Sequence, residues 1–314
     1  MPVFDKLLLV FFGCVMLMTN GSALAAIRLG VLPSSDAVLI HVAHEEGLFT
    51  ANGLSVTPIP FTSALEISAA MRAGKIDGQY CDLMTVLLQN ERGIGQKLIV
   101  ATTYPNPSQR AFGLAVSPKY ANQYSTLASL ENVSVAMSSK SIVEYLLDRM
   151  IATENLPATA LKPVEIRQIQ VRLQTVLAGQ MATAMLPEPF LTLIEAKGGH
   201  VLWDDRRLGE AKSFIALRNE HIDAQTVDGF RRAIRESARR IAADPERYRQ
   251  LMVEKRLLPK EAASTFEMIS AEAIRRTGGL PAMATEEEVS VMAQWLRRKA
   301  MIREPVRYED VVVP

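Results

Sequence analysis

A strand–helix plan that occurs twice is the feature that most constrains the fold of this chain. In the first copy, a strand over 27–32 and the pair Ser34-Ser35 are followed by a helix, a strand and a helix that ends at Gly74. The second copy has a strand over 133–136, the pair Ser138-Ser139 and a helix that ends at Gly179. In both copies the serine pair begins about 40 residues before the glycine. Short apolar strands that alternate with amphipathic helices are typical of α/β folds with parallel sheets, so the sequence predicts two similar lobes.

An acidic residue follows each glycine at a similar distance, after one more short strand. This residue is Asp82 in the first copy and Glu188 in the second. Beyond the second copy the chain has one further strand, over 212–217, and then helices predicted over 224–243, 245–255 and 286–301. The helical C-terminal part therefore has no counterpart in the repeat.

The first 25 residues have the pattern of a secretory signal peptide. Lys6 precedes an apolar run over 7–18, and the small-residue site Ala23-Leu24-Ala25 follows. The run is shorter than the ~20 residues that a membrane-spanning helix needs. We expect cleavage after Ala25 and a periplasmic protein. Lipidation at Cys14 is the alternative, although Phe11 and Phe12 fit a lipobox poorly.

Composition excludes several classes of protein. Lys and Arg number 35 against 34 Asp and Glu, which gives a net charge of +1 and no overall field that would attract nucleic acid. Two cysteines and four histidines are too few for a disulfide scaffold or a His-rich metal site. We therefore expect no nucleic-acid partner, no metal and no cofactor, and after cleavage Cys81 is the single cysteine.

Four short motifs are characteristic of this chain: Gly30-Val31-Leu32-Pro33, the helix end His44-Glu45-Glu46-Gly47-Leu48-Phe49, Ala73-Gly74-Lys75-Ile76-Asp77-Gly78 and Leu186-Pro187-Glu188-Pro189-Phe190. In this order they resemble the solute-binding proteins of ABC importers. More narrowly, the sequence resembles the branch that handles nitrate, sulfonates, taurine and thiamine pyrimidine precursors. The resemblance covers nearly all of the chain after residue 25.

This resemblance implies an α/β, two-lobed periplasmic-binding-protein fold of type II, in which each lobe is a mainly parallel sheet flanked by helices and the ligand cleft lies between the lobes. It places the first lobe at 26–116 and 207–314 and the second lobe at 117–206, with the two crossing strands at 111–118 and 212–217. It also implies a monomer whose partners are a small-molecule ligand and the permease subunits of an importer.

Ligands of open parallel sheets bind beyond the carboxyl ends of the strands, where helix N-termini supply free N–H groups. That rule selects loop residues from both lobes as candidates for ligand binding. They are Ser34, Ser35, Asp36, Thr62, Ser63, Cys81, Asp82, Thr102, Tyr104, Ser138, Ser139, Gln170 and Glu188.

Helix capping is the alternative role for several of these residues. Ser63 with Glu66, and Ser141 with Glu144, fit the capping-box pattern, and Asp82 precedes a helix that it could cap. Since Ser141 offers a cap of its own, Ser138 and Ser139 are better candidates for ligand binding than the other serines.

The candidate loops are rich in hydroxyls and contain the carboxylates Asp82 and Glu188, one from each lobe. Lys140 and Arg172 are the only cations near the loops of the second lobe. Because carboxylates accept hydrogen bonds from amino-substituted rings and repel anions, we expect a neutral or cationic planar nitrogen compound resembling a thiamine pyrimidine precursor. The alternative is a sulfonate, taurine or nitrate held by backbone N–H groups at the serine pairs.

The sequence favours a binding protein over an enzyme. No nucleophile–base pair, metal cluster or acid–base pair is visible, and His41 and His44 lie well inside a helix. The competing class is an enzyme on the same two-lobed fold, similar to a pyrimidine synthase or a dehydratase. Such an enzyme would be cytosolic, so the location of the protein in the cell discriminates between the two.

Overall fold

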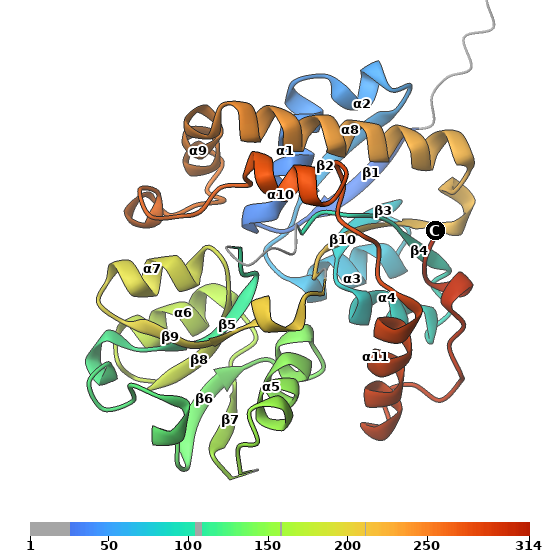
Figure 1. Cartoon of the computed structure of the whole chain (residues 1–314). Helices are drawn as coiled ribbons and strands as arrows, with labels where there is room; N and C mark the ends of the chain where they lie inside the picture. The colour runs from blue at the N-terminus through green and yellow to red at the C-terminus, as the bar shows by residue number, and fades with distance from the viewer. Residues whose placement is uncertain (1–25, 104–108, 158, 211) are drawn as a thin grey trace, which may run out of the picture.

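The computed structural model describes residues 26–103, 109–157, 159–210 and 212–314. The predicted signal peptide, its Cys14 and the candidate ligand residue Tyr104 lie outside these residues. Figure 1 shows two lobes: the N-terminal part and most of the C-terminal part of the chain lie above, and the middle part lies below.

Each lobe contains one five-stranded sheet. The first consists of β1 (Ala26–Val31), β2 (Ser55–Pro60), β3 (Gly78–Cys81), β4 (Gln96–Ala101) and β10 (Phe214–Arg218), in the order β2-β1-β3-β10-β4. The second consists of β5 (Phe112–Val116), β6 (Val133–Met137), β7 (Leu161–Glu165), β8 (Thr183–Pro187) and β9 (His200–Asp204), in the order β7-β6-β8-β5-β9. Since corresponding strands occupy corresponding places, the repeat predicted from the sequence is confirmed.

In each sheet one strand runs against the other four. β10 is antiparallel to β3 and β4, and β5 is antiparallel to β8 and β9, whereas β1 and β6 pair in parallel with their neighbours. The sheets are therefore mixed but mainly parallel, as expected. The two antiparallel strands are those that enter each sheet from the other lobe.

The strand pairing does not agree with the predicted boundary of the first lobe at residue 116. Phe112–Val116 were placed in the first lobe, but β5 lies between β8 and β9 of the second sheet. The chain therefore passes from one lobe to the other before β5. Strand β9 was not predicted.

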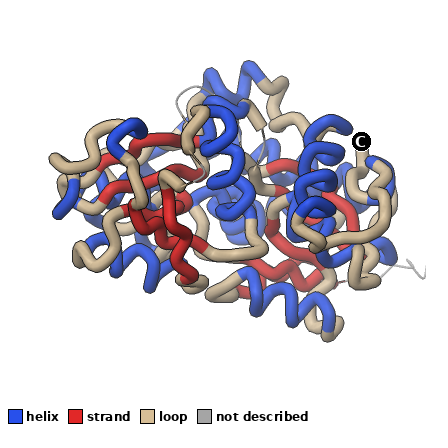
Figure 2. The backbone as a smooth tube through the Cα atoms, turned by 90° about the horizontal axis from the view of Figure 1, so that it is seen from below, coloured by secondary structure: helices blue, strands red, loops and turns tan. Residues whose placement is uncertain are grey.

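Helices cover both sheets, as Figure 2 shows for the view from below. The helices are α1 (Val38–Glu45), α2 (Leu48–Ala51), α3 (Ala64–Arg72), α4 (Leu83–Asn90), α5 (Ile142–Thr153), α6 (Ile169–Leu177), α7 (Phe190–Ala196), α8 (Ala224–Ala243), α9 (Pro245–Glu254), α10 (Ala271–Arg276) and α11 (Glu286–Arg298). The boundaries predicted for α8 are confirmed, whereas α10 was not predicted. Among the described residues, no helix is long and apolar enough to span a membrane.

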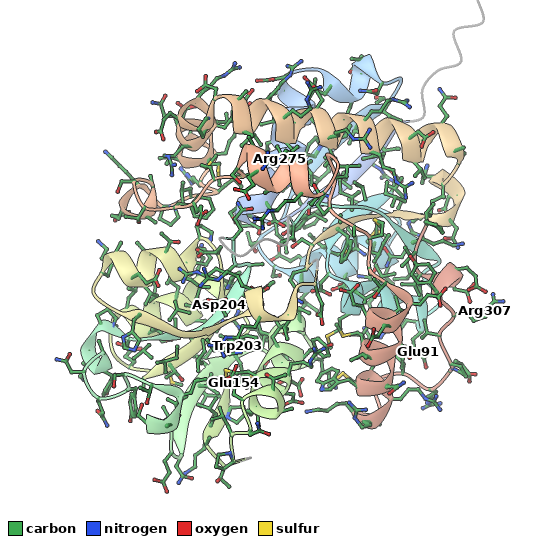
Figure 3. All side chains as sticks on the ribbon, viewed as in Figure 1. Glu91, Glu154, Trp203, Asp204, Arg275 and Arg307 are labelled. Carbon is green, nitrogen blue, oxygen red and sulfur yellow. The ribbon has the colours of Figure 1, made fainter. Side chains whose placement is uncertain are left out.

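The core of each lobe lies between its sheet and its helices. In the first lobe, Phe49 of α2 packs edge to face on Phe230 of α8, with ring centroids 5.2 Å apart. In the second lobe, Trp203 of β9 is 2% exposed and lies inside the lobe, as Figure 3 shows. Burial of such aromatic side chains provides much of the driving force for folding.

A buried carboxylate ties β1 to the start of β3. Asp77 accepts three hydrogen bonds from Arg28: from its backbone N and its Nε at 2.8 Å, and from its Nη2 at 2.6 Å. These hydrogen bonds lower the pKa of Asp77 below its ordinary value.

We expect this contact to make the stability of the protein vary with pH in the acidic range. A carboxyl whose pKa is lowered in the folded state stabilises the protein above its unfolded pKa of about 3.9, and this contribution is lost as the pH falls through the folded pKa. Asp77→Asn should therefore lower the free energy of unfolding at pH 7 and have a smaller effect at pH 3. Urea unfolding at both pH values tests this, and an equal loss at both would contradict it.

Candidate ligand-binding cleft

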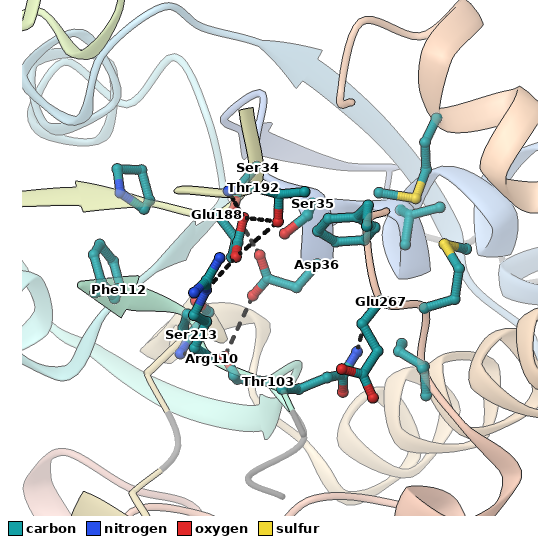
Figure 4. A pocket seen from close by; sticks show the side chains of 18 of the residues that line it. Ser34, Ser35, Asp36, Thr103, Arg110, Phe112, Glu188, Thr192, Ser213 and Glu267 are labelled. Carbon is teal, nitrogen blue, oxygen red and sulfur yellow. Dashed lines mark hydrogen bonds and ion pairs between the residues drawn. The ribbon is translucent and has the colours of Figure 1, made fainter. Parts of the chain in front are cut away.

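Two adjoining cavities lie between the lobes. The first has a volume of about 260 Å³, and residues from both lobes line it, including Asp36, Thr102, Arg110, Glu188 and Phe266. Figure 4 shows that the side chains of Asp36 and Glu188, one from each lobe, point into the same space. The second cavity has a volume of about 170 Å³. The two cavities share four lining residues, namely Ser34, Phe112, Pro187 and Ser213.

The structure brings together most of the residues that the sequence selected. Those that line the first cavity are Ser34, Ser35, Asp36, Thr102 and Glu188. Those that line the second cavity are Ser34, Thr62, Ser63, Cys81, Asp82, Ser138 and Gln170. Loops that are far apart in the sequence meet here because the strands before them end at the facing edges of the two sheets.

Ser139 does not line either cavity. Its backbone N and its hydroxyl donate to the carboxylate of Glu165. This contact forms because the end of β7 lies beside the loop after β6. Lys140 is exposed and also lies outside both cavities. Ser139 therefore has a structural contact in place of the predicted contact with a ligand.

Asp36 is the centre of a hydroxyl network in the first cavity. Its Oδ1 accepts from Ser34 Oγ and Tyr80 Oη, both at 2.6 Å. Its Oδ2 accepts from Thr102 Oγ1 at 3.4 Å and from Thr103 Oγ1 at 3.3 Å. Burial raises the pKa of Tyr80 far above its ordinary value, so its hydroxyl stays protonated and remains a donor.

Helix capping explains two of the candidate residues. Ser63 Oγ accepts from the backbone N of Glu66 at 3.3 Å, and Asp82 Oδ1 accepts from the backbone N of Thr85 at 2.6 Å. These hydrogen bonds confirm the caps predicted for α3 and α4. The cap predicted at Ser141 is wrong, because this hydroxyl donates to the carbonyl of Ser138 and α5 has no side-chain cap.

Glu188 is already paired with an arginine that the sequence analysis did not select. Arg110 Nε lies 2.6 Å from Glu188 Oε1, and Arg110 Nη2 lies 2.5 Å from Glu195 Oε2. Thr192 also donates to Glu188 through its backbone N at 3.2 Å and through its hydroxyl. Burial lowers the pKa of Arg110, but the hydrogen bonds and charges of Glu195 and Glu188 outweigh this effect and raise it above the ordinary value.

The loops of the cleft contain more positive charge than the sequence predicted. Arg167, Arg172 and Lys212 line the second cavity, and Arg110 and Arg206 line the first. Arg172 was noted as a cation near these loops, and the structure places it 2% exposed inside the cleft. Arg110 was missed because it directly precedes the first crossing strand, whereas the selection took only residues that follow the carboxyl ends of strands.

The described residues contain no group of three or more His, Cys, Asp or Glu that could hold a metal ion. The cleft instead offers hydroxyls, helix N-termini, ionised side chains and apolar walls. Such a set of groups can bind an organic solute by hydrogen bonds and charge.

The two repeated lobes with a lined cleft between them define a class, the α/β fold of periplasmic binding proteins, and solved structures agree. One is the alkanesulfonate-binding protein SsuA from Xanthomonas axonopodis pv. citri bound to MOPS, with 17% identity, a TM-score of 0.71 and coverage of 92% of this chain and 98% of that chain. Another is the periplasmic nitrate-binding protein NrtA from Synechocystis PCC 6803, with 12% identity, a TM-score of 0.67 and coverage of 92% and 86%.

The periplasmic aliphatic sulphonate binding protein SsuA from Escherichia coli is similar too, with 15% identity, a TM-score of 0.71 and coverage of 92% of both chains. No curated protein matches the sequence. The model of the NMT1-like family matches residues 20–254, so the chain belongs to the NMT1-like family.

Proposed function

We propose that this protein is a periplasmic solute-binding protein that captures a small organic solute between its lobes and delivers it to an ABC importer. The observation that carries the proposal is the cleft itself, because polar residues from both lobes meet around two adjoining cavities. A site divided between two lobes suits capture by closure, in which the ligand stabilises the closed arrangement. The names of the similar structures, which are sulfonate-binding and nitrate-binding proteins, support the same role.

Cleavage after Ala25, a periplasmic location, a monomeric state and permease partners are parts of this proposal. We also propose that the protein acts by binding and not by catalysis. Two of the acidic residues in the cleft already have partners in the protein: Glu188 pairs with Arg110, and Asp82 caps the N-terminus of α4.

Two measurements test this function. The first is fractionation of cells that carry the tagged protein, together with mass determination of its N-terminus. The second compares the uptake of a solute in cells with and without the gene, after identification of the solute by mass spectrometry of the purified protein. An uncleaved cytosolic protein, or uptake that does not depend on the gene, would contradict the proposal and favour the enzyme.

The pyrimidine-precursor ring that the sequence favoured stays a prediction. It relied on Asp82 and Glu188 as acceptors for amino groups, and both carboxylates already accept protein hydrogen bonds. An aminopyrimidine therefore belongs in any binding screen as a competitor of charged solutes.

A further inference from the structure

The two halves of the cleft carry opposite charge. The charged residues that line the second cavity are Arg167, Arg172 and Lys212 against Asp82. Arg167 pairs with Glu165 and Lys212 with Glu210, so Arg172 is the one of these three cations that has no ion pair among the described residues. The charged residues that line the first cavity are Asp36, Glu188, Glu195 and Glu267 against Arg110 and Arg206. Because the cavities share four lining residues, one solute can extend from the positive half into the negative half.

In the second cavity, Arg172 has donor capacity that the protein does not use. Its side chain is buried, and its Nε has no hydrogen-bond partner among the described residues. Its Nη1 donates to the carbonyl of Ile166 at 3.3 Å. Burial lowers the pKa of Arg172 to about 10, so the guanidinium remains charged at neutral pH. A buried cation with an unpaired donor is costly unless a ligand supplies an acceptor.

Helix N-termini add to this positive end. Residues from the first turns of α5 and α6, including Ile142 and Gln170, line the second cavity. Neither helix has a side-chain hydrogen bond at its N-cap. The partial positive charge of these helix ends and the guanidinium of Arg172 together favour an oxyanion such as a sulfonate or a carboxylate.

In the first cavity, Asp36 carries a negative charge but already has its full set of hydrogen bonds. Its carboxylate forms no ion pair with any residue that the structure describes, and it already accepts four hydrogen bonds from hydroxyls. Since a carboxylate has about four acceptor positions, Asp36 can attract a cation but has little capacity left to accept an N–H hydrogen bond.

Apolar side chains also line the first cavity. Phe112 lines both cavities, and Phe266, Met252 and Met268 line the first. Aromatic rings and methionine sulfurs stabilise cations that carry methyl groups in place of N–H donors. A primary ammonium placed at Asp36 would lose water without gaining a free carboxylate acceptor, because hydroxyls already occupy both oxygens of Asp36.

We propose that the solute is a zwitterion of the betaine type, with an oxyanion bound at Arg172 in the second cavity and an alkylated ammonium beside Asp36 and Phe266 in the first. This inference rests on the proposed function, since it names the class of solute for the same cleft.

The test is isothermal titration of the purified mature protein with three matched series of probes. The first consists of ω-trimethylammonio-alkanesulfonates with two to four carbons, the second of the corresponding primary amines, and the third of alkanesulfonates without nitrogen. The trimethylated probes should bind about tenfold or more tightly than the nitrogen-free probes, and more tightly than the primary amines. Carboxylate analogues of the first series identify the oxyanion.

Variants then assign the two ends of the solute. Arg172→Gln should weaken binding of all sulfonates, whereas Asp36→Asn and Phe266→Leu should remove only the preference for the trimethylated probes. Arg207→Gln is the matched control, because Arg207 is exposed, pairs with Glu154 and lines neither cavity. A structural role of Asp36 would lower the affinity for the nitrogen-free probes by the same factor.

The probes on the parent protein decide the proposal even if a variant does not fold. Equal affinity for trimethylated and nitrogen-free sulfonates would overturn it, as would tighter binding of the primary amines or binding of an aminopyrimidine alone. In each of these cases the role in solute binding would stand. Failure of the proposed function would give a different result: cells without the gene would take up every solute as well as cells that carry it.

Discussion

Replacing Arg110 with leucine is expected to lower the free energy of unfolding by about 3–5 kcal/mol at pH 7. Arg110 is the only cation that the structure places on the carboxylate of Glu188, whose side chain is 8% exposed. Its removal leaves a buried charge with hydrogen bonds from Thr192 alone. Such a charge costs much more than the pair itself contributes, because water no longer solvates it.

The pH dependence of this variant has a definite sign. Burial already raises the pKa of Glu188 above its ordinary value, and Arg110 opposes this effect, so the loss of Arg110 raises the pKa further above the unfolded value of about 4.3. A group with a raised folded pKa favours folding at low pH, and this advantage is lost as the pH rises through the folded pKa. The stability deficit of Arg110→Leu should therefore be largest at neutral pH and decrease toward pH 4.

Urea unfolding at several pH values measures both effects. The double variant Arg110→Leu/Glu188→Gln should regain most of the lost stability, since the unpaired charge is gone. Arg207→Gln is the control for loss of an arginine, and its exposed pair should be worth no more than about 1 kcal/mol. A loss of this small size for Arg110→Leu, without pH dependence, would show that Glu188 is solvated.

Local patterns in the sequence were sufficient to predict two similar lobes and two of the caps. The spacing from each serine pair to its glycine predicted two equivalent lobes, and the two sheets have the same order. Ser63 and Asp82 have the predicted capping hydrogen bonds because a cap depends only on the next three residues.

The charge of the cleft depends on packing between distant segments, and the sequence could not reveal it. Arg110 reaches Glu188 and Glu195 across about 80 residues of chain. Arg172 has the sequence context of a solvated helix residue, but in the structure it is buried and lines the second cavity. Likewise, Ser139 meets Glu165 through the pairing of β6 with β7.

The lobes are held together unequally at the two ends of the cleft, which bears on how it opens. At one end α11 of the first lobe contacts α5 of the second. Trp295 Nε1 donates to Asp148 at 3.0 Å, its ring packs edge to face on Tyr145 at 5.5 Å, and Lys299 Nζ lies 2.8 Å from Asp148. At the other end, Lys197 after α7 and Glu261 of η6 (Lys260–Ala262) form an exposed ion pair of 3.8 Å.

Trp295→Ala is expected to lower the free energy of unfolding by about 3–5 kcal/mol, the usual cost of removing a buried tryptophan. Trp295 is 5% exposed, and its loss also leaves Asp148 without its indole donor. Trp295→Phe keeps the aromatic contact with Tyr145 and should cost less. Lys197→Ala should cost no more than about 1 kcal/mol, because its ion pair is exposed.

These three variants also test where the cleft opens. If the α5–α11 contact is the pivot, Lys197→Ala keeps the pivot and removes a contact at the end that must separate, near the first cavity. It should raise the dissociation rate of a bound solute with little change in stability, whereas Trp295→Ala should disturb the relative position of the lobes even without solute. Stopped-flow dissociation and small-angle scattering measure the two effects. A dissociation rate that responds to Trp295→Phe and not to Lys197→Ala would place the opening at the α5–α11 end instead.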